Sequence, residues 1–317
     1  MFTRMSRRLI VALSLLIVFT LSTVALASDK IRIASVSWTG VTIKTDLAVT
    51  ILDQLGYNAE NLLVSVPVAY QAMSTGDADA FLGNWMPSMK TLADKYFQDG
   101  SVVQLCPNMT GAKYTLAVPT YEYEAGLKNF SDIAKFADKL DHKIYGIEEG
   151  NDGNIIIENM IKKNMFNLGN FKLVASSEIG MLGEVHSFVK DKKWIVFLGW
   201  APHSMNENID MKYLDGSTDE TFGPDNGSAT VYTNVRKGFT KDYPNLTVFL
   251  KNFTFPVAMM NQIMVELKKD QNQKPVSAAL HWLKSHPDMY KGWLKDVKTK
   301  DGKPALPAFE AYMKTVE

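Results

Sequence analysis

The chain has 317 residues, 34 basic and 34 acidic side chains, and one cysteine, Cys106. The balanced charge argues against a nucleic-acid-binding protein, which would need a basic surface, and a lone cysteine excludes an intramolecular disulfide. The length is sufficient for two lobes of ordinary domain size.

The first 27 residues have the features of a secretory signal peptide. Three arginines within the first eight residues form a basic head, residues 9–24 are an apolar run, and Ala25-Leu26-Ala27 is a small-x-small cleavage site. The alternative is a retained membrane anchor, because the apolar run is nearly long enough to span a bilayer. Cleavage would leave residues 28–317, which contain no second long apolar segment. We therefore expect a soluble protein exported to the periplasm.

Strand and helix patterns alternate over the first part of the exported chain. The expected strands are 31–36, 61–66, 78–82, 102–105 and 113–118, and the expected helices are 43–55, 68–74 and 87–97. The last of these helices begins at Pro87, a residue suited to a first helical turn. This alternation predicts an α/β fold built from βαβ units around a mainly parallel sheet.

A second run of the same kind follows, and the chain then becomes helical. The second run has expected helices 132–140, 154–165 and 178–189, expected strands 142–147, 171–174, 194–198 and 230–235, a short extended piece at 212–214 and a loop at 215–228. Helical spacing then covers 243–251, 257–269, 275–285, 288–295 and 308–316. We expect these last helices to pack against the first lobe, with the extended segments 113–118 and 230–235 as the crossovers. Lobe 1 is then 28–118 plus 230–317, and lobe 2 is 119–229.

Three tryptophans lie where apolar runs end, each close to a glycine. Trp38 follows strand 31–36, Trp85 follows strand 78–82 after a break at Gly83, and Trp200 follows strand 194–198. Ligands of α/β sheets bind at the carboxyl ends of the strands, so these rings are expected to wall one pocket. The other three tryptophans, Trp194, Trp282 and Trp293, fall inside a strand or at helical spacing, which favours ordinary core positions.

A cluster of aromatic faces suits a quaternary ammonium ion. Methylated nitrogen cannot donate strong hydrogen bonds, so cation–π attraction and burial of its methyl groups hold it instead. Each desolvated ring contributes about 2 kcal/mol, and four rings supply about 8 kcal/mol, which corresponds to micromolar binding.

A polar turn separates strand 142–147 from the next helix. It reads Glu148-Glu149-Gly150-Asn151-Asp152-Gly153-Asn154, and its glycines and the helix start are suited to an anion. Asn and Asp are equally common as turn and capping residues, so a purely structural role is as good an interpretation. The turn lacks the spacing of a dinucleotide-binding fingerprint.

Motifs of enzymes are absent from the sequence. It contains no G-x-S-x-G, no H-E-x-x-H and no Walker-type loop, and its five histidines are scattered. The sequence therefore predicts no catalytic residue, no metal site and no cofactor. An exported enzyme acting on a methylated amine is the rival hypothesis, and it would need a catalytic group near the aromatic cluster.

The motifs Trp38, Gly83-Asn84-Trp85-Met86-Pro87, Gly150-Asn151-Asp152-Gly153-Asn154 and Gly199-Trp200-x-Pro202-His203 together resemble the periplasmic choline-binding proteins of ABC importers. These belong to the wider glycine betaine/proline betaine substrate-binding group. The resemblance implies a two-lobed periplasmic-binding-protein fold of type II that closes on its ligand, each lobe a mainly parallel sheet flanked by helices. It implies an aromatic box of Trp38, Trp85, Tyr114 and Trp200, with Asn151 as a polar contact. It also implies a permease in the inner membrane with its ATPase as partners.

One position departs from the choline-binding pattern. Choline binders of this kind carry an aspartate two residues after the first tryptophan, where this chain has Gly40. Asp46 and Asp152 are candidates to replace that acid. Gly40 could instead favour a betaine carboxylate, although Lys90 stands where several betaine binders have a histidine. We therefore expect choline as the ligand, with glycine betaine or another methylated zwitterion, such as carnitine or proline betaine, as the alternative.

Overall fold

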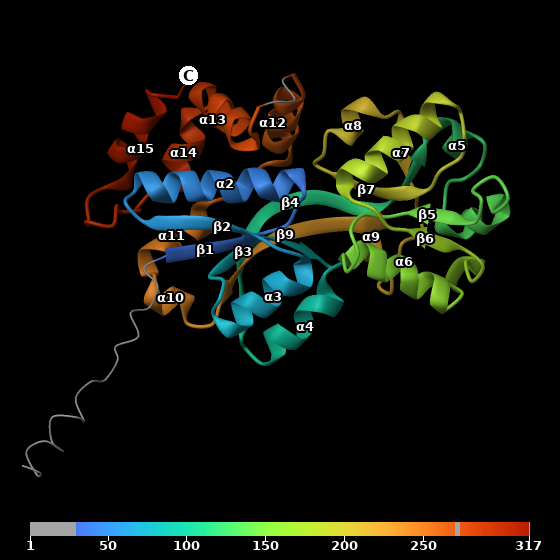
Figure 1. Ribbon diagram of the computed structural model, residues 1–317, viewed down its shortest axis with the longest axis horizontal. Coiled ribbons are helices and arrows are strands. Elements are labelled where there is room, and N and C mark those ends of the chain that lie inside the picture. Colours follow the sequence, from blue (N-terminus) through green and yellow to red (C-terminus); the bar gives the residue numbers. More distant parts are fainter. Residues whose placement is uncertain (1–29, 270–272, 317) are drawn as a thin grey trace, which may run out of the picture. The chain divides into compact units, whose positions relative to one another are not determined.

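Figure 1 shows the computed structural model of the chain, in which residues 30–269 and 273–316 are described. The predicted signal peptide, residues 1–27, lies outside the described residues. In the part of the chain that is described, no helix combines the length and the apolar character needed to cross a membrane.

The described strands form one nine-stranded mixed sheet with two long strands in its middle. β4 (Val102–Pro119) and β9 (Ser228–Arg236) pair antiparallel with each other. On the β9 side lie β3 (Ala80–Met86), β1 (Lys30–Ser35) and β2 (Asn58–Leu63). On the β4 side lie β7 (Phe197–Ala201), β5 (Lys143–Tyr145) and β6 (Lys172–Val174), with β8 (Met211–Tyr213) paired to β4.

The βαβ pattern expected from the sequence is present at both ends of this sheet. β1 pairs parallel with β3, and β5 pairs parallel with β6 and β7. The middle differs from the expectation of a mainly parallel sheet, because β9 pairs antiparallel with β3, and β4 pairs antiparallel with β7 and β8. The two long strands therefore connect two parallel groups, and Figure 1 shows them running from one group to the other.

Two hydrophobic cores lie on the faces of this sheet. The longer helices of the first core are α2 (Thr39–Gln54), α11 (Pro244–Asn252), α12 (Val257–Lys269), α13 (Pro275–Ser285), α14 (Pro287–Trp293) and α15 (Ala305–Met313). Those of the second core are α3 (Val66–Thr75), α4 (Lys90–Gln98), α6 (Asp152–Lys162) and α7 (Glu178–Lys190). As expected, the C-terminal helices pack against the first part of the chain, with α12, α13 and α15 against α2 (Figure 1).

Short helices occupy the connections. They are α5 (Thr120–Glu124), η1 (Phe130–Phe136), η2 (Met165–Asn167), α8 (Met205–Asn208), α9 (Pro224–Gly227) and α10 (Phe239–Asp242). The expected helix 132–140 is thus a 3-10 helix, and the expected loop 215–228 contains one short helix. Neither departure changes the order of the main elements.

Strand β3 does not end at Gly83, as the sequence suggested. It runs on to Met86, because β9 supplies partners for Asn84, Trp85 and Met86 beyond a bulge between Phe81 and Asn84. Gly83 serves packing instead of chain reversal, since a Cβ there would lie 2.8 Å from the Phe81 ring and 2.9 Å from Val41. Trp85 therefore projects from the end of a strand, not from a loop.

Several other expected boundaries were wrong, and three of them bear on the aromatic residues or on the long strands. The helix expected from Pro87 begins at Lys90, because Pro87 lies in a turn that precedes it. Strand β7 begins at Phe197, so Trp194 precedes it and Trp200 lies inside it. The two strands expected at 102–105 and 113–118 are one strand, β4, whose register against β9 shifts three times.

Candidate functional site

One cavity brings the aromatic residues of the two parallel groups together. It contains about 520 Å³ of empty space, a figure that includes open solvent at its mouth. Its lining residues are Trp38, Gly40, Val41, Lys44, Trp85, Met109, Tyr114, Ile147, Asp152, Trp200, Pro202, Met260 and Met264. Seven residues were predicted from the sequence as ligand contacts. All of them except Asn151 line this cavity, namely Trp38, Gly40, Trp85, Tyr114, Asp152 and Trp200.

Four aromatic rings come from four different elements. Trp38 is the N-cap residue of α2, Trp85 lies near the end of β3, and Tyr114 and Trp200 are directly opposite each other in the β4–β7 pair. The Tyr114 ring lies 5.9 Å from the Trp85 ring and 6.2 Å from the Trp200 ring, centroid to centroid, at interplanar angles of 60° and 83°. Such edge-to-face packing holds the rings apart at fixed angles, so their faces are available to a ligand.

Tyr114 is fixed by contacts behind the cavity. Its hydroxyl donates a hydrogen bond to Asn151 Oδ1 at 3.1 Å, and its ring packs edge-on against Phe222 at 5.4 Å. Gly153 makes this approach possible, since a Cβ there would lie 2.0 Å from the tyrosine hydroxyl. Burial raises the pKa of Tyr114 well above its usual value, and the negative charges of Asp152 and Glu148 add to the effect. Tyr114 is therefore a neutral donor at physiological pH.

Asn151 acts as a helix cap. It is the N-cap residue of α6, and its Oδ1 accepts from the amides of Gly153 and Asn154 as well as from Tyr114. Its amide group donates to Asp152 Oδ1 at 3.1 Å. The structure therefore places Asn151 behind the cavity lining, where it orients Tyr114 and Asp152.

Asp152 is a buried carboxylate that faces the cavity. Only 2% of the residue is exposed, and its Oδ2 has no hydrogen-bond partner among the described residues. Burial raises the pKa of Asp152 to about 6, because an ion deprived of water is destabilised. A cation in the cavity would supply the missing counter-charge.

The remaining polar candidates lie differently. Gly40 lines the cavity, and a Cβ there would meet the end of Met264 at 3.1 Å. Asp46, the other candidate acid, accepts from Asn61 and is not a lining residue. Lys90 is exposed and pairs with Asp94 at 2.5 Å, away from the cavity. Of the two acids considered, only Asp152 lines the cavity.

One charged residue of the lining, Lys44, was not predicted from the sequence. It lies on α2, is 3% exposed, and donates from Nζ to Leu82 O at 2.9 Å and to Asn108 Oδ1 at 3.0 Å. Burial lowers the pKa of Lys44 to about 7. Its position was a usable indication, because Val41, Lys44, Ala48 and Ile51 share the spacing of one buried helix face, where a lysine is unusual.

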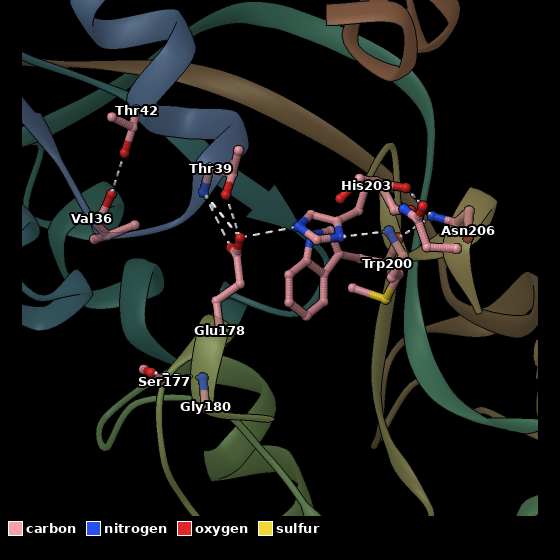
Figure 2. A network of polar contacts seen from close by, with 12 residues as sticks. Val36, Thr39, Thr42, Ser177, Glu178, Gly180, Trp200, His203 and Asn206 are labelled. Atoms are coloured by element: carbon pink, nitrogen blue, oxygen red, sulfur yellow. Dashed lines mark hydrogen bonds and ion pairs between the residues drawn. The ribbon is translucent and has the colours of Figure 1, made fainter. Parts of the chain in front are cut away.

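Further contacts join the start of α2 to the second parallel group. The Trp38 Nε1 donates to Glu148 Oε1 at 2.7 Å. Trp38 gives α2 no side-chain cap, and the amide and hydroxyl of Thr39 instead donate to the carboxylate of Glu178 on α7, at 3.2 and 2.5 Å (Figure 2). A carboxylate at a helix N-terminus is favourable, since the helix dipole and the unpaired amides attract it.

His203 completes this network. Its Nδ1 accepts from the Met205 amide at 3.0 Å, so its Nε2 carries the proton and donates to Glu178 at 3.0 Å (Figure 2). The His203 ring also packs against the Trp200 ring, with centroids 5.0 Å apart. Glu178 thus connects the start of α2 to a tryptophan of the aromatic cluster. The described residues include no group of three His, Cys, Asp or Glu side chains arranged to hold a metal ion.

Comparison with known families identifies the chain. Residues 29–285 match the substrate-binding domain of ABC-type glycine betaine transport systems. The chain belongs to this family. Members of the glycine betaine substrate-binding family are extracytoplasmic proteins that bind small ligands and work with ABC transporters.

Solved structures of this family share the fold. An ABC-transporter choline-binding protein in complex with choline is 46% identical, with a TM-score of 0.87 over 90% of this chain and 98% of that one. Lactococcal OpuAC complexed with glycine betaine is 28% identical, with a TM-score of 0.74 over 83% and 98% of the two chains. The expected α/β fold of the type II periplasmic-binding proteins is therefore confirmed.

Two curated relatives match about half of the chain each. An uncharacterized protein, ORF1, of Chromohalobacter salexigens is 44% identical over 48% of this chain and 97% of its own length. The glycine betaine/carnitine transport binding protein GbuC of Listeria monocytogenes is 31% identical over 52% of this chain and 53% of its own.

Proposed function

We propose that this protein captures a trimethylammonium solute, with choline as the first candidate, and delivers it to an ABC permease and its ATPase in the inner membrane. The single observation that carries the proposal is the cavity itself, which is lined by four aromatic rings and by Asp152, a buried carboxylate whose Oδ2 has no hydrogen-bond partner among the described residues. Aromatic faces and one carboxylate match a permanent cation that has no N–H to donate. The choline complex of the 46% identical relative supports the same ligand class.

In this proposal Trp38, Trp85, Tyr114 and Trp200 enclose the methyl groups and Asp152 neutralises the charge. Asn151 holds Tyr114 and Asp152 in position and does not contact the solute. A methylated zwitterion is the second candidate, because Gly40 stands where the choline-binding pattern has its aspartate and Lys44 lines the same cavity. The binding of glycine betaine and carnitine by named relatives supports this class.

Capture would use the two lobes predicted from the sequence, 28–118 plus 230–317 and 119–229, with β4 and β9 as the hinge. The contacts of Trp38 with Glu148 and of Thr39 with Glu178 would hold the closed form. The protein would be exported to the periplasm after removal of residues 1–27. It would perform no chemistry, so a bound solute should be recovered unchanged after incubation.

Calorimetric titration with choline, glycine betaine, carnitine and trimethylamine N-oxide tests the proposal. Replacement of Trp85 by alanine should weaken binding more than tenfold, because a desolvated ring contributes about 2 kcal/mol to cation binding. The matched control is Trp282→Ala. Trp282 is stacked on His286, with ring centroids 3.7 Å apart, and does not line the cavity. Unchanged affinity in Trp85→Ala, or no binding of any of the four solutes, would refute the aromatic box.

A further inference from the structure

The cavity contains a second charged residue that a cation-binding site does not need. Lys44 lines the same space as the four aromatic rings and Asp152. Lys44 lies on the buried face of α2, one helical turn after Gly40 and two positions after Thr42. The space beside Gly40 thus lies between the N-cap tryptophan, Trp38, and the lysine.

The surroundings of Lys44 do not neutralise it. Its Nζ donates to two uncharged acceptors, the Leu82 carbonyl and Asn108, and lies 5.8 Å from the centre of the Phe255 ring. Among residues 30–269 and 273–316 no carboxylate forms an ion pair with it. An ammonium group has three N–H donors, so one remains for a group in the cavity that Lys44 lines.

A charged Lys44 and a bound trimethylammonium ion would repel each other inside one low-dielectric cavity. The repulsion disappears in two ways. Lys44 can lose its proton, and its nitrogen then accepts a hydrogen bond from a hydroxyl. Alternatively, the ligand can bring its own carboxylate, which an ammonium group binds strongly.

We propose that Lys44 is a specificity-determining residue that reads the second end of the solute: choline binds with Lys44 neutral, and a trimethylammonium carboxylate binds with Lys44 protonated. This inference rests on the proposed function. Choline binding then releases a proton from Lys44, and zwitterion binding takes one up. The protein changes its preferred solute with pH while the aromatic box stays the same.

The depressed pKa of Lys44, about 7, places this exchange in the physiological range. Other titratable groups near the cavity are Asp152 on α6, with a pKa of about 6, Glu148, whose pKa burial also raises, and Tyr114. Glu178 of α7 and its partner His203, which packs against Trp200, lie behind them. In this proposal Asp152 and these neighbours act on the trimethylammonium end, which both solutes share. The neighbours of the Lys44 ammonium group do not titrate: they are Leu82 O of β3, Asn108 of β4 and the Phe255 ring. Met109 of β4 and Met260 and Met264 of α12, which line the same cavity, do not titrate either.

The comparison of two solutes therefore isolates Lys44, because effects at the shared end cancel in the ratio of their dissociation constants. With a pKa of about 7, choline binding weakens about tenfold from pH 8 to pH 6 and zwitterion binding strengthens about tenfold. The ratio of the two constants then changes about 100-fold over two pH units.

The experiment is calorimetric titration of the full exported chain with choline, glycine betaine and carnitine at pH 6, 7 and 8. The two zwitterions carry their carboxylate at different distances from the trimethylammonium group. Each titration is repeated in buffers of different ionisation enthalpy, which gives the number of protons exchanged. At pH 7 we expect choline and a zwitterion to differ in the number of protons exchanged on binding. Between pH 6 and pH 8 we expect the ratio of their dissociation constants to change about 100-fold.

Two variants locate the effect. Lys44→Met removes the charge, and Lys44→Gln removes it while keeping a donor for the Leu82 carbonyl. Either variant that folds should bind choline and zwitterion with a ratio that is independent of pH. If neither folds, the proton count of the unmodified protein still decides the matter.

A wild-type ratio that stays constant from pH 6 to pH 8 for both zwitterions would overturn the role of Lys44 and leave the trimethylammonium site intact. A pH-dependent ratio that persists in Lys44→Met would also overturn it. Failure of all three solutes to bind would refute the proposed function and this inference with it.

Discussion

Replacement of Asp152 by asparagine removes one negative charge from the cavity and almost no volume. The Asp152 Oδ1 accepts from Asn151, and the asparagine carbonyl can accept the same bond, so the α6 cap is preserved. A carboxylate about 5 Å from a bound cation contributes about 3 kcal/mol at an effective dielectric constant of about 20. Part of this attraction remains in the variant, because the asparagine carbonyl oxygen still presents a partial negative charge to the cation. A net loss of about 2 kcal/mol remains, or about 30-fold in the dissociation constant.

Titration of both proteins with choline at pH 8 measures this loss. The matched control is Asp46→Asn, an equally conservative change on α2 at a carboxylate that does not line the cavity. The loss should shrink below pH 6, because Asp152 of the unmodified protein is then protonated before the cation arrives. Affinity within twofold of the unmodified protein at pH 8, or an equal loss in Asp46→Asn, would refute the reasoning.

Two further substitutions address closure and stability. Glu178→Gln removes the charge that binds the Thr39 amide and His203. It should destabilise the closed form and so weaken solute binding severalfold, while the far-ultraviolet circular dichroism spectrum stays unchanged. Tighter binding in calorimetry would contradict this. Glu122 is buried, accepts from the Ile195 amide and has a pKa raised to about 8 by burial. The folded state therefore holds the Glu122 proton more tightly than the unfolded state does. The contribution of this proton to the stability of the fold is complete below pH 4.5 and is lost as the pH rises towards 8. Glu122→Gln should raise the melting temperature at pH 8 and not at pH 4.5; equal shifts at both would contradict the assignment.

The elements that the sequence predicts best are those whose boundaries are set by residues within the element itself. Helices α12 and α13 begin and end at the expected residues, since helical spacing and the Pro275 start are local features. The end of β3 was not predictable in this way. Its last three residues are extended because β9, about 150 positions later, offers them partners, and nothing near Gly83 records that pairing.

The candidate site divides along the same line. Trp38, Trp85 and Trp200 were found because a large aromatic beside a glycine at the end of an apolar run is conspicuous. The network of Glu178 and His203 was not found, because a contact between residues 139 positions apart leaves no pattern in a single sequence. Lys44 did leave one, a charged residue on the buried face of a helix.

The first turn of helix α2 depends on another helix for the acceptor of one of its amides. Its N-cap residue, Trp38, gives no side-chain cap, and the amide of Thr39 is satisfied by Glu178 of α7. If the lobes part as proposed, this amide loses its acceptor and the turn that carries Trp38 and Gly40 frays into solvent. Capture of a solute then includes the folding of one helical turn, and amide hydrogen exchange at Thr39 would slow on binding. Residues of α7 that never touch the solute could thus adjust affinity over evolution while the aromatic box stays unchanged.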